Sequence, residues 1–203
     1  MKKLYILRHG ETDFNKNGMV QGSGINSSLN ETGRAQSEAF YQAYQHIDFD
    51  KIYVSELIRT RETVDKFILR GIVTQALVGL NEISWGVQEG LAFTPESSTV
   101  YQQTCDAWSN GDLEARIEGG ETPAEVATRQ RMAMDHILAS EGSTILISTH
   151  GRAIRILLCT LLGYPLQMMT NFGHNNTGVY VLNCIGSVFS IETFNDTSHL
   201  GKI

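Results

Sequence analysis

Two short apolar runs of the chain each end in a histidine followed by a glycine. The first run ends in Arg8-His9-Gly10, and the second, far along the chain, ends in Thr149-His150-Gly151. Histidine can act as a nucleophile, a proton carrier or a metal ligand, and arginine can hold an anion. Because strand ends can meet at one edge of a sheet, the two histidines can serve a single site.

A histidine beside fixed positive charge suits the transfer of a phosphoryl group. An enzyme that uses no metal must offset the charge on the phosphoryl oxygens with fixed cations and hydrogen bonds. The guanidinium groups of Arg8 and Arg59 are planar and always charged, so each can hold two such oxygens. A neutral His9 can attack phosphorus and form a phosphohistidine, which divides one difficult displacement into two easier steps. The alternative for Arg59 is a solvated helix-face charge paired with Glu56 or Glu62.

A metal site is the alternative for the same histidines. His9, His150 and Glu82 could be assembled as two histidines and one carboxylate. The arginines beside them would repel a cation, and the chain has no HxH or HExxH spacing. The sequence therefore predicts neither a metal nor a cofactor.

The elements that must position these residues alternate between strands and helices, which indicates an α/β protein. Apolar runs predict the strands, and helical patterns fill most of the gaps between the first four runs. The predicted strands cover residues 4–7, 52–54, 72–73, 145–147, 179–182 and 188–194. Residues 183–187 are few enough to join the last two strands as an antiparallel hairpin.

Capping signals mark several helices. Asn30 is a candidate N-cap, and Thr122-Pro123-Ala124-Glu125 forms a capping box with proline at the first helical position. Another helix is expected after Ser55, and a further one runs from just after His150 to Gly163. The turn at His150 therefore offers free backbone N–H groups to an anion. The helix after Asn30 is expected to turn one apolar face to the core, with Ala35, Ala39, Phe40, Ala43, Tyr44 and Ile47.

Length and charge limit the kinds of protein and partner. With 203 residues and 41% hydrophobic content, the chain is expected to form one compact domain. Sixteen Lys and Arg against 22 Asp and Glu give a net charge of −6, which disfavours nucleic acid and anionic membranes as partners. The short N-terminal apolar run and the lack of any run near membrane-spanning length predict a cytoplasmic protein. Three scattered cysteines, Cys105, Cys159 and Cys184, are expected to be buried free thiols.

Residues 83–121 are richer in polar residues and glycine, and they are expected to form a helical insertion or lid over the site. Trp85, Tyr101 and Trp108 lie within this segment. The large apolar side chains here and in the late helix can face either the core or a partner subunit, so a homodimer is one of two arrangements that the sequence allows.

Further motifs occur in a fixed order along the chain. They are Arg8-His9-Gly10-Glu11-Thr12, Asn15, Gln21-Gly22, the segment 55–63, Glu82 with Gly86, Glu89-Gly90, Gly119-Gly120-Glu121 and Thr149-His150-Gly151. Together they resemble the histidine phosphatase superfamily, the phosphoglycerate-mutase-like proteins, over nearly the whole chain. The resemblance implies a three-layer α/β/α fold with a mainly parallel central sheet and a small helical lid. It also implies a single histidine phosphatase domain over residues 1–203.

The resemblance also implies roles for individual residues. His9 matches the family's nucleophile, whose ring the family holds through a backbone carbonyl, and Glu82 matches the general acid. A carboxyl group beside a bound phosphate dianion can hold a proton near neutral pH and donate it to the leaving oxygen. His150 is expected to donate to the phosphoryl oxygens, and to be protonated only while phosphate is bound. The expected phosphate contacts are Arg8, Asn15, Gln21, Gly22, Arg59, His150 and Gly151.

Other motif residues are assigned lesser roles. Glu11, Glu89 and Glu121 are expected to support the site or to cap helices, and His174 is a candidate for the pocket lining. Three histidines outside the motifs are expected at the surface: His46, His136 and His199.

The family contains phosphatases, which give the phosphoryl group to water, and mutases, which return it to the substrate. Classical cofactor-dependent mutases of the family carry extra residues between the acid region and the Gly-Gly-Glu motif. Here only 37 positions separate Glu82 from Gly119. The chain is therefore expected to be a metal-independent phosphomonoesterase for small phosphorylated metabolites.

Two other functions remain as alternatives. One is a phosphoglycerate mutase that depends on 2,3-bisphosphoglycerate, and the other is an inactive protein that binds a phosphorylated ligand, although none of its catalytic motif residues is lost. The chain lacks the tryptophans that the family usually has after Gln21-Gly22 and at Gln88. Both positions belong to the pocket rim, so the resemblance does not identify the substrate.

Overall fold

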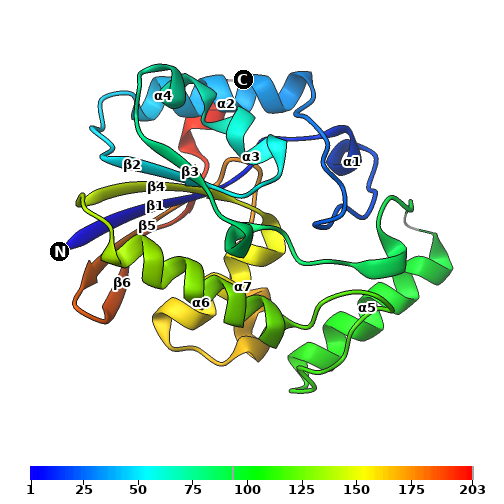
Figure 1. Ribbon diagram of the computed structural model, residues 1–203. Coiled ribbons are helices and arrows are strands. Elements are labelled where there is room, and N and C mark those ends of the chain that lie inside the picture. The colour runs from blue at the N-terminus through cyan, green and yellow to red at the C-terminus, as the bar shows by residue number, and fades with distance from the viewer. Residues whose placement is uncertain (93, 203) are drawn as a thin grey trace.

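A six-stranded sheet forms the centre of the computed structural model, which describes residues 1–92 and 94–202 (Figure 1). The strand order is β3-β2-β4-β1-β5-β6. Four neighbouring strands, from β3 to β1, are parallel, whereas β5 runs antiparallel to both β1 and β6. The strands are β1 (Lys2–Arg8), β2 (Lys51–Val54), β3 (Thr74–Ala76), β4 (Thr144–Thr149), β5 (Val179–Ile185) and β6 (Val188–Asp196). The predicted mainly parallel sheet and its terminal hairpin are confirmed.

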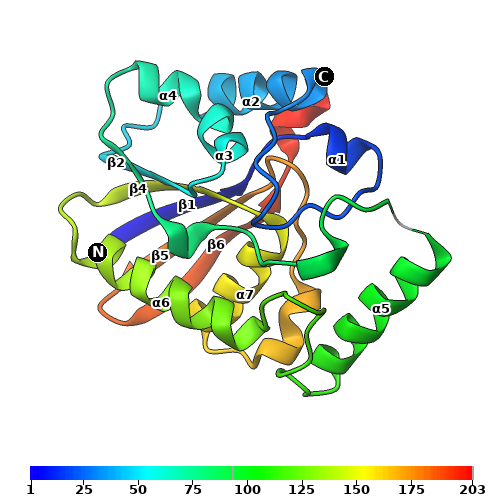
Figure 2. The same ribbon diagram turned by 45° about the vertical axis from the view of Figure 1, so that its right-hand side comes forward.

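Helices cover both faces of the sheet, as the three-layer prediction required (Figures 1 and 2). On one face, α2, α3 and α4 enclose a cluster built around Phe40, Phe49 and Phe67. On the other face, α6 and α7 pack buried side chains such as Ile137 and Leu157 against the strands. The helices are α1 (Asp13–Lys16), α2 (Glu31–Tyr44), α3 (Ile58–Thr63), α4 (Asp65–Leu69), α5 (Pro95–Ser109), α6 (Pro123–Ala139) and α7 (Gly151–Leu162).

The capping signals locate the helix ends correctly. The Asn30 side chain accepts a hydrogen bond from the Gly33 N–H at the start of α2, and Thr122 forms the predicted capping box of α6. Gly163 ends α7 with a φ of 72°, a left-handed conformation that glycine adopts without steric cost. Each cap satisfies backbone groups that a helix end leaves without a partner.

The edge strand β3 lies later than its apolar pattern predicted. The prediction placed it at 72–73, whereas the strand covers Thr74–Ala76, and Gln75 and Ala76 are exposed. An edge strand pairs on one side only, so its position here is set by backbone pairing of Thr74 with Ile52 in β2. Hydrophobic periodicity is weak where neither face of a strand is buried.

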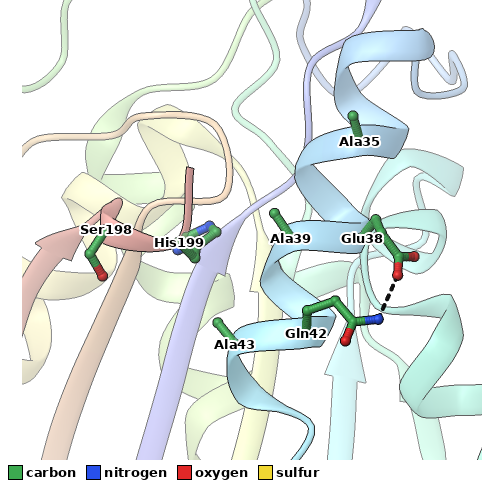
Figure 3. Close-up of a pocket in the computed structure, with 7 residues that line it drawn as sticks. All are labelled: Ala35, Glu38, Ala39, Gln42, Ala43, Ser198 and His199. Atoms are coloured by element: carbon green, nitrogen blue, oxygen red, sulfur yellow. Dashed lines mark hydrogen bonds between the residues drawn. The ribbon is translucent and has the colours of Figure 1, made fainter. Parts of the chain in front are cut away.

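The C-terminal 3₁₀ turn Ser198–Lys202 packs beside α2, and this contact corrects two predictions (Figure 3). His199 is only 8% exposed and its ring stacks edge-on against Phe40, so it is not a surface histidine. Ala43 is exposed, because the alanines of α2 line a surface cavity of about 550 Å³ beside His199 instead of filling the core. Tyr44 and Ile47 pack against the core as expected, although Ile47 lies beyond the end of α2.

The segment 83–121, which is predicted to form a helical insertion or lid, contains one long helix, and residue 93 lies outside the described residues. Its main helix, α5, lies beyond the carboxyl ends of the parallel strands (Figure 2). Trp85 and Trp108 are buried with their ring centroids 5.6 Å apart, and Tyr101 lies 4.8 Å from Trp85. These aromatic side chains therefore face the core, as do Leu157 and Leu158 of α7.

The cysteines and the helices test two further predictions, namely buried free thiols and the lack of a membrane-spanning segment. Cys105, Cys159 and Cys184 are buried and free, as expected. Within residues 1–92 and 94–202, none of the helices combines the length and the apolar character that a membrane span requires.

Candidate active site

The register of two parallel strands brings the histidines together. Arg8 of β1 pairs with Thr149 of β4, so His9 and His150 both leave the sheet at its carboxyl edge. The His9 N–H also donates to the Thr149 carbonyl at 3.0 Å. The two imidazole centroids are 5.1 Å apart, and both rings are buried. The predicted meeting of the two His-Gly turns is thus present in the fold.

A backbone carbonyl fixes the ring of His9. Its Nδ1 lies 2.7 Å from the Gly10 carbonyl oxygen, which can only accept, so Nδ1 carries the hydrogen and Nε2 keeps its lone pair. Burial, followed by the charges of Arg59 and Arg8, holds the pKa of His9 well below its usual range. A neutral imidazole with one free lone pair is the form that can attack an electrophile.

Close packing holds the carbonyl that orients His9. The Gly10 N–H donates to Oγ1 of Thr63 at 2.9 Å, and that hydroxyl donates to the Arg59 carbonyl. A Cβ at Gly10 would lie 2.6 Å from the Gly33 carbonyl oxygen in the first turn of α2, a distance that no side chain tolerates. Glycine at position 10 therefore serves the approach of this loop to α2.

His150 is also neutral, with the opposite ring nitrogen protonated. Nε of Arg59 donates to Nδ1 of His150 at 3.2 Å, and Nε2 of His150 therefore donates to Oγ of Ser55 at 2.8 Å. Ser55 in turn contacts Oγ1 of Thr60 at 3.0 Å. Burial, then the neighbouring cations and His9, keeps the pKa of His150 well below its usual range. This chain of hydrogen bonds ties the start of α3 to the end of β4.

Arg8 and Arg59 are cations without a carboxylate partner within salt-bridge distance in the part of the chain that the structure describes; Arg59 is buried and Arg8 is partly buried. Nη1 of Arg8 donates to the His174 carbonyl at 2.7 Å, and Nε of Arg8 has no hydrogen-bond partner among the described residues. Arg59 donates to the carbonyls of Gly22 and Ile25. Burial lowers the pKa of Arg59 to about 10, so it still carries its charge at neutral pH. The alternative of a solvated helix-face Arg59 is wrong, because the side chain is 0% exposed.

Glu82 contacts the first turn of α7. One carboxylate oxygen accepts from the Arg152 N–H at 3.1 Å, and the other accepts from the N–H groups of Ala153 and Ile83 at 2.9 and 3.0 Å. The Glu82 side chain therefore lies against the free backbone N–H groups at the start of α7. Glu82 is buried and lies beside Gly151, in the turn that the sequence marks as a place for an anion.

A cavity of about 140 Å³ opens at this edge of the sheet and contains five of the predicted residues in its wall. These are Arg8, Asn15, Gln21, Glu82 and Gly151. The four others do not line the cavity: His9, Gly22 and His150 are each next in sequence to a lining residue, and Arg59 is hydrogen-bonded to His150. His174 lines it, as expected, and burial, then Arg8 and Arg155, lowers the pKa of His174 to about 3.

The acidic motif residues hold the surrounding loops. Glu11 accepts from the Asn30 side chain, and Glu89 accepts from the backbone N–H groups of Gly24 and Trp85. Glu121 accepts from the Ser84 N–H and pairs with Arg129. Their predicted role as supports or caps agrees with these contacts.

Sequence reasoning missed part of the cavity wall. Arg152, Trp85 and Tyr101 line it together with Met19 and Val20. Arg152 directly follows the second His-Gly, and a cation at the start of a helix, where the dipole disfavours it, was the signal that could have found it. Its guanidinium lies over the rings of Trp85 and Trp108, at 5.6 and 5.4 Å from their centroids. No group of three or more His, Cys, Asp or Glu side chains within 1–92 and 94–202 is placed to hold a metal ion.

Comparison with protein families agrees with this geometry. The model of the histidine phosphatase superfamily, branch 1, matches residues 4–197. This chain belongs to that superfamily. A probable phosphoglycerate mutase GpmB of Erwinia tasmaniensis is 30% identical to it, with 98% of this chain and 95% of the relative aligned. A protein of the same name from Yersinia pestis is 32% identical over the same shares of the two chains.

Solved structures of the superfamily share the fold. The mycobacterial glucosyl-3-phosphoglycerate phosphatase complexed with VO₃ has a TM-score of 0.87 and 26% identity, covering 97% of this chain and all of the other. The phosphoserine phosphatase of Entamoeba histolytica, in complex with 3-phosphoglyceric acid, has a TM-score of 0.85 and 27% identity, covering 98% and 100%. The superfamily neighbours are thus phosphatases and phosphoglycerate-mutase-like proteins. Members of both groups are enzymes, and membership of the superfamily indicates that this chain is one too.

Proposed function

We propose that the protein hydrolyses phosphate monoesters of small metabolites through a phosphohistidine on His9. The observation that carries the proposal is the 2.7 Å hydrogen bond from Nδ1 of His9 to the Gly10 carbonyl. It leaves Nε2 with a lone pair in a neutral ring, beside two arginines that have no carboxylate partner among the described residues. That combination suits attack on a phosphoryl group whose negative charge the arginines offset.

In the first step, Nε2 of His9 attacks phosphorus as the bond to the ester oxygen breaks. The leaving oxygen takes a proton from the carboxyl group of Glu82, and the three N–H groups around Glu82 stabilise the carboxylate that remains. Arg8, Arg59 and the Gly151 turn hold the phosphoryl oxygens. A phosphoryl dianion beside His150 favours its protonated form, in which Nδ1 gives up the hydrogen bond from Nε of Arg59 and becomes a further donor.

In the second step, the carboxylate of Glu82 takes a proton from a water molecule, whose oxygen attacks phosphorus. The N–P bond breaks, inorganic phosphate leaves, and the His9 lone pair is restored. Glu82 thus regains its proton and His9 its lone pair, while the phosphoryl group has passed from the ester oxygen to water. The cations are supplied by arginine side chains, so we propose that neither step needs a metal or another cofactor.

The names of the relatives support two reaction types. The structural neighbours named above are phosphatases, whereas the curated relatives are named as probable phosphoglycerate mutases. The connection from Glu82 to Gly119 spans only 37 positions. Such a short lid favours hydrolysis, because it leaves room for water to reach the phosphohistidine. A mutase dependent on 2,3-bisphosphoglycerate is the second candidate, since a mutase also needs the His9 and Glu82 arrangement.

A screen of phosphorylated metabolites tests this choice. Free phosphate and isomerised product are measured separately, with and without 2,3-bisphosphoglycerate, and a His9→Ala protein is the control for contaminating phosphatases. Hydrolysis is expected to dominate and to require His9. Isomerisation that depends on the bisphosphate, with little free phosphate, would replace the hydrolase by the mutase.

We also infer how this enzyme is organised. Residues 1–203 form one histidine phosphatase domain, and the segment 83–121 covers the site as a lid, which the position of α5 beyond the strand ends supports. The three buried free thiols support a cytoplasmic location, where thiols stay reduced.

A further inference from the structure

Arg152 is a cation of the cavity wall to which the hydrolytic steps above assign no role. It is the second residue of α7, yet its side chain extends to the helical insertion. Nη2 donates to the Tyr101 hydroxyl at 2.9 Å and to Sγ of Cys105 at 3.4 Å, both on α5. Trp85 and Trp108 lie within cation–π distance of the same group. These contacts hold the guanidinium in one orientation.

One nitrogen of this guanidinium is unsatisfied. Arg152 is 6% exposed, and Nη1 has no hydrogen-bond partner among the described residues. No carboxylate in the described part of the chain lies within salt-bridge distance of it. Buried cationic donors are normally paired, because water is not there to solvate them. A residue of the cavity wall with such a donor is built to meet an anionic group.

The charged side chains around the cavity indicate how much negative charge the substrate must carry. Arg8 and Arg152 lie in the wall and Arg59 bonds to His150 next to it, whereas Glu82 is the one carboxylate that lines the cavity within residues 1–92 and 94–202. When Glu82 holds the proton that it donates, three positive charges lie in or next to the wall of the cavity. A phosphoryl dianion offsets two of them, and one charge is left.

The unpaired donor of Arg152 and the one remaining positive charge favour a carboxylate as the second anionic group. A guanidinium edge matches the two oxygens of a planar carboxylate, which carries a single charge. A second phosphate would bring two charges and more bulk. The cavity of about 140 Å³ is well below the roughly 300–1,000 Å³ of drug-sized pockets, so it suits a substrate of few heavy atoms.

We propose that Arg152 binds a carboxylate of the substrate, so that the enzyme acts on phosphorylated hydroxy or amino acids. The inference rests on the proposed phosphatase function for its chemistry, and it adds the substrate class. Arg152 is a specificity residue in this assignment: it binds the part of the substrate that does not react, while Arg8, Arg59 and His9 act on the phosphoryl group.

Binding of phosphoserine and phosphoethanolamine tests the assignment, because the two esters differ only by the carboxylate. Calorimetric titration of the His9→Ala protein measures both affinities without turnover. Phosphoserine should bind about 10- to 100-fold more tightly, the range expected for one hydrogen-bonded charge pair. Adding Arg152→Gln should bring the ratio close to one, and Arg152→Lys should restore part of it. Arg131→Gln, an exposed arginine on α6, is the matched control and should keep the original ratio.

Equal affinities for the two esters, or no measurable binding of either, overturn the proposal. So does a preference for phosphoserine that persists in the Arg152→Gln protein. If Arg152→Gln fails to fold, the ratio in the His9→Ala protein and the Arg152→Lys variant still decide the question. Failure of the phosphatase function is seen separately, as wild-type protein that releases no phosphate from p-nitrophenyl phosphate.

Discussion

Replacing His174 by glutamine should make the protein more resistant to acid. Burial, followed by the charges of Arg8 and Arg155, lowers the pKa of His174 from 6.5 to about 3. Between those two values, the unfolded chain binds a proton at this position and the native protein does not. The free energy of unfolding of the wild type therefore falls as the pH drops below 6.5.

The size of the effect follows from the two pKa values. Each pH unit below 6.5 costs about 1.4 kcal/mol for one such group, which gives about 2.5 kcal/mol between pH 7 and pH 4.5. The ring is half-buried, and solvent screening reduces this to about 2 kcal/mol. His174→Gln lacks the group, so its unfolding free energy relative to the wild type should rise by that amount over the same range.

Urea unfolding at pH 7.0, 5.5 and 4.5 measures this difference, provided that the slope against urea is the same for both proteins. His46→Gln, which removes an exposed imidazole, is the matched control. The pKa of His174 can be read directly from the NMR titration of its ring. A constant stability difference between His174→Gln and wild type, or the same pH response in His46→Gln, would refute the reasoning.

Three further perturbations test the site. Glu82→Gln should lower kcat/KM for an alkyl phosphate by about 10²- to 10⁴-fold, but far less for p-nitrophenyl phosphate, whose leaving group needs no proton; equal losses would argue against a general acid. Ser55→Ala removes the acceptor for Nε2 of His150 and should lower the free energy of unfolding in urea by about 1–3 kcal/mol, so an unchanged midpoint would show that this bond carries no weight. Treatment with EDTA should leave the rate of phosphate release unchanged, whereas inhibition that added metal reverses would revive a metal site.

Much of the fold can be predicted from local signals that tertiary structure leaves intact. The capping residues Asn30 and Thr122 satisfy backbone groups of their own helices, and Gly163 adopts a conformation that favours glycine, so each marks a helix end by itself. Where the outcome depends on packing, the sequence was less informative. His199 is buried because the C-terminal turn folds back on α2, a contact between distant segments that no periodicity reveals.

The candidate site likewise has one part that local sequence signals predict and another part that only the packing of the fold reveals. The His-Gly turns can be found because a strand end and a helix start mark them, and parallel pairing of β1 with β4 then brings His9 and His150 together. The carbonyl of Gly10 that fixes the ring of His9 carries no side-chain signal. Arg152 was missed because its partners lie some 50 residues away on α5, and only the fold shows that its charge is buried.

The central claim is that His9 carries the phosphoryl group, and chemical trapping tests it most directly. The protein is mixed with a ³²P-labelled phosphate monoester, quenched within milliseconds in alkali and digested, and the labelled peptide is sequenced. We expect a base-stable, acid-labile phosphate on His9 that disappears in His9→Ala. A label on any other residue, or steady release of phosphate by the His9→Ala protein, would contradict it.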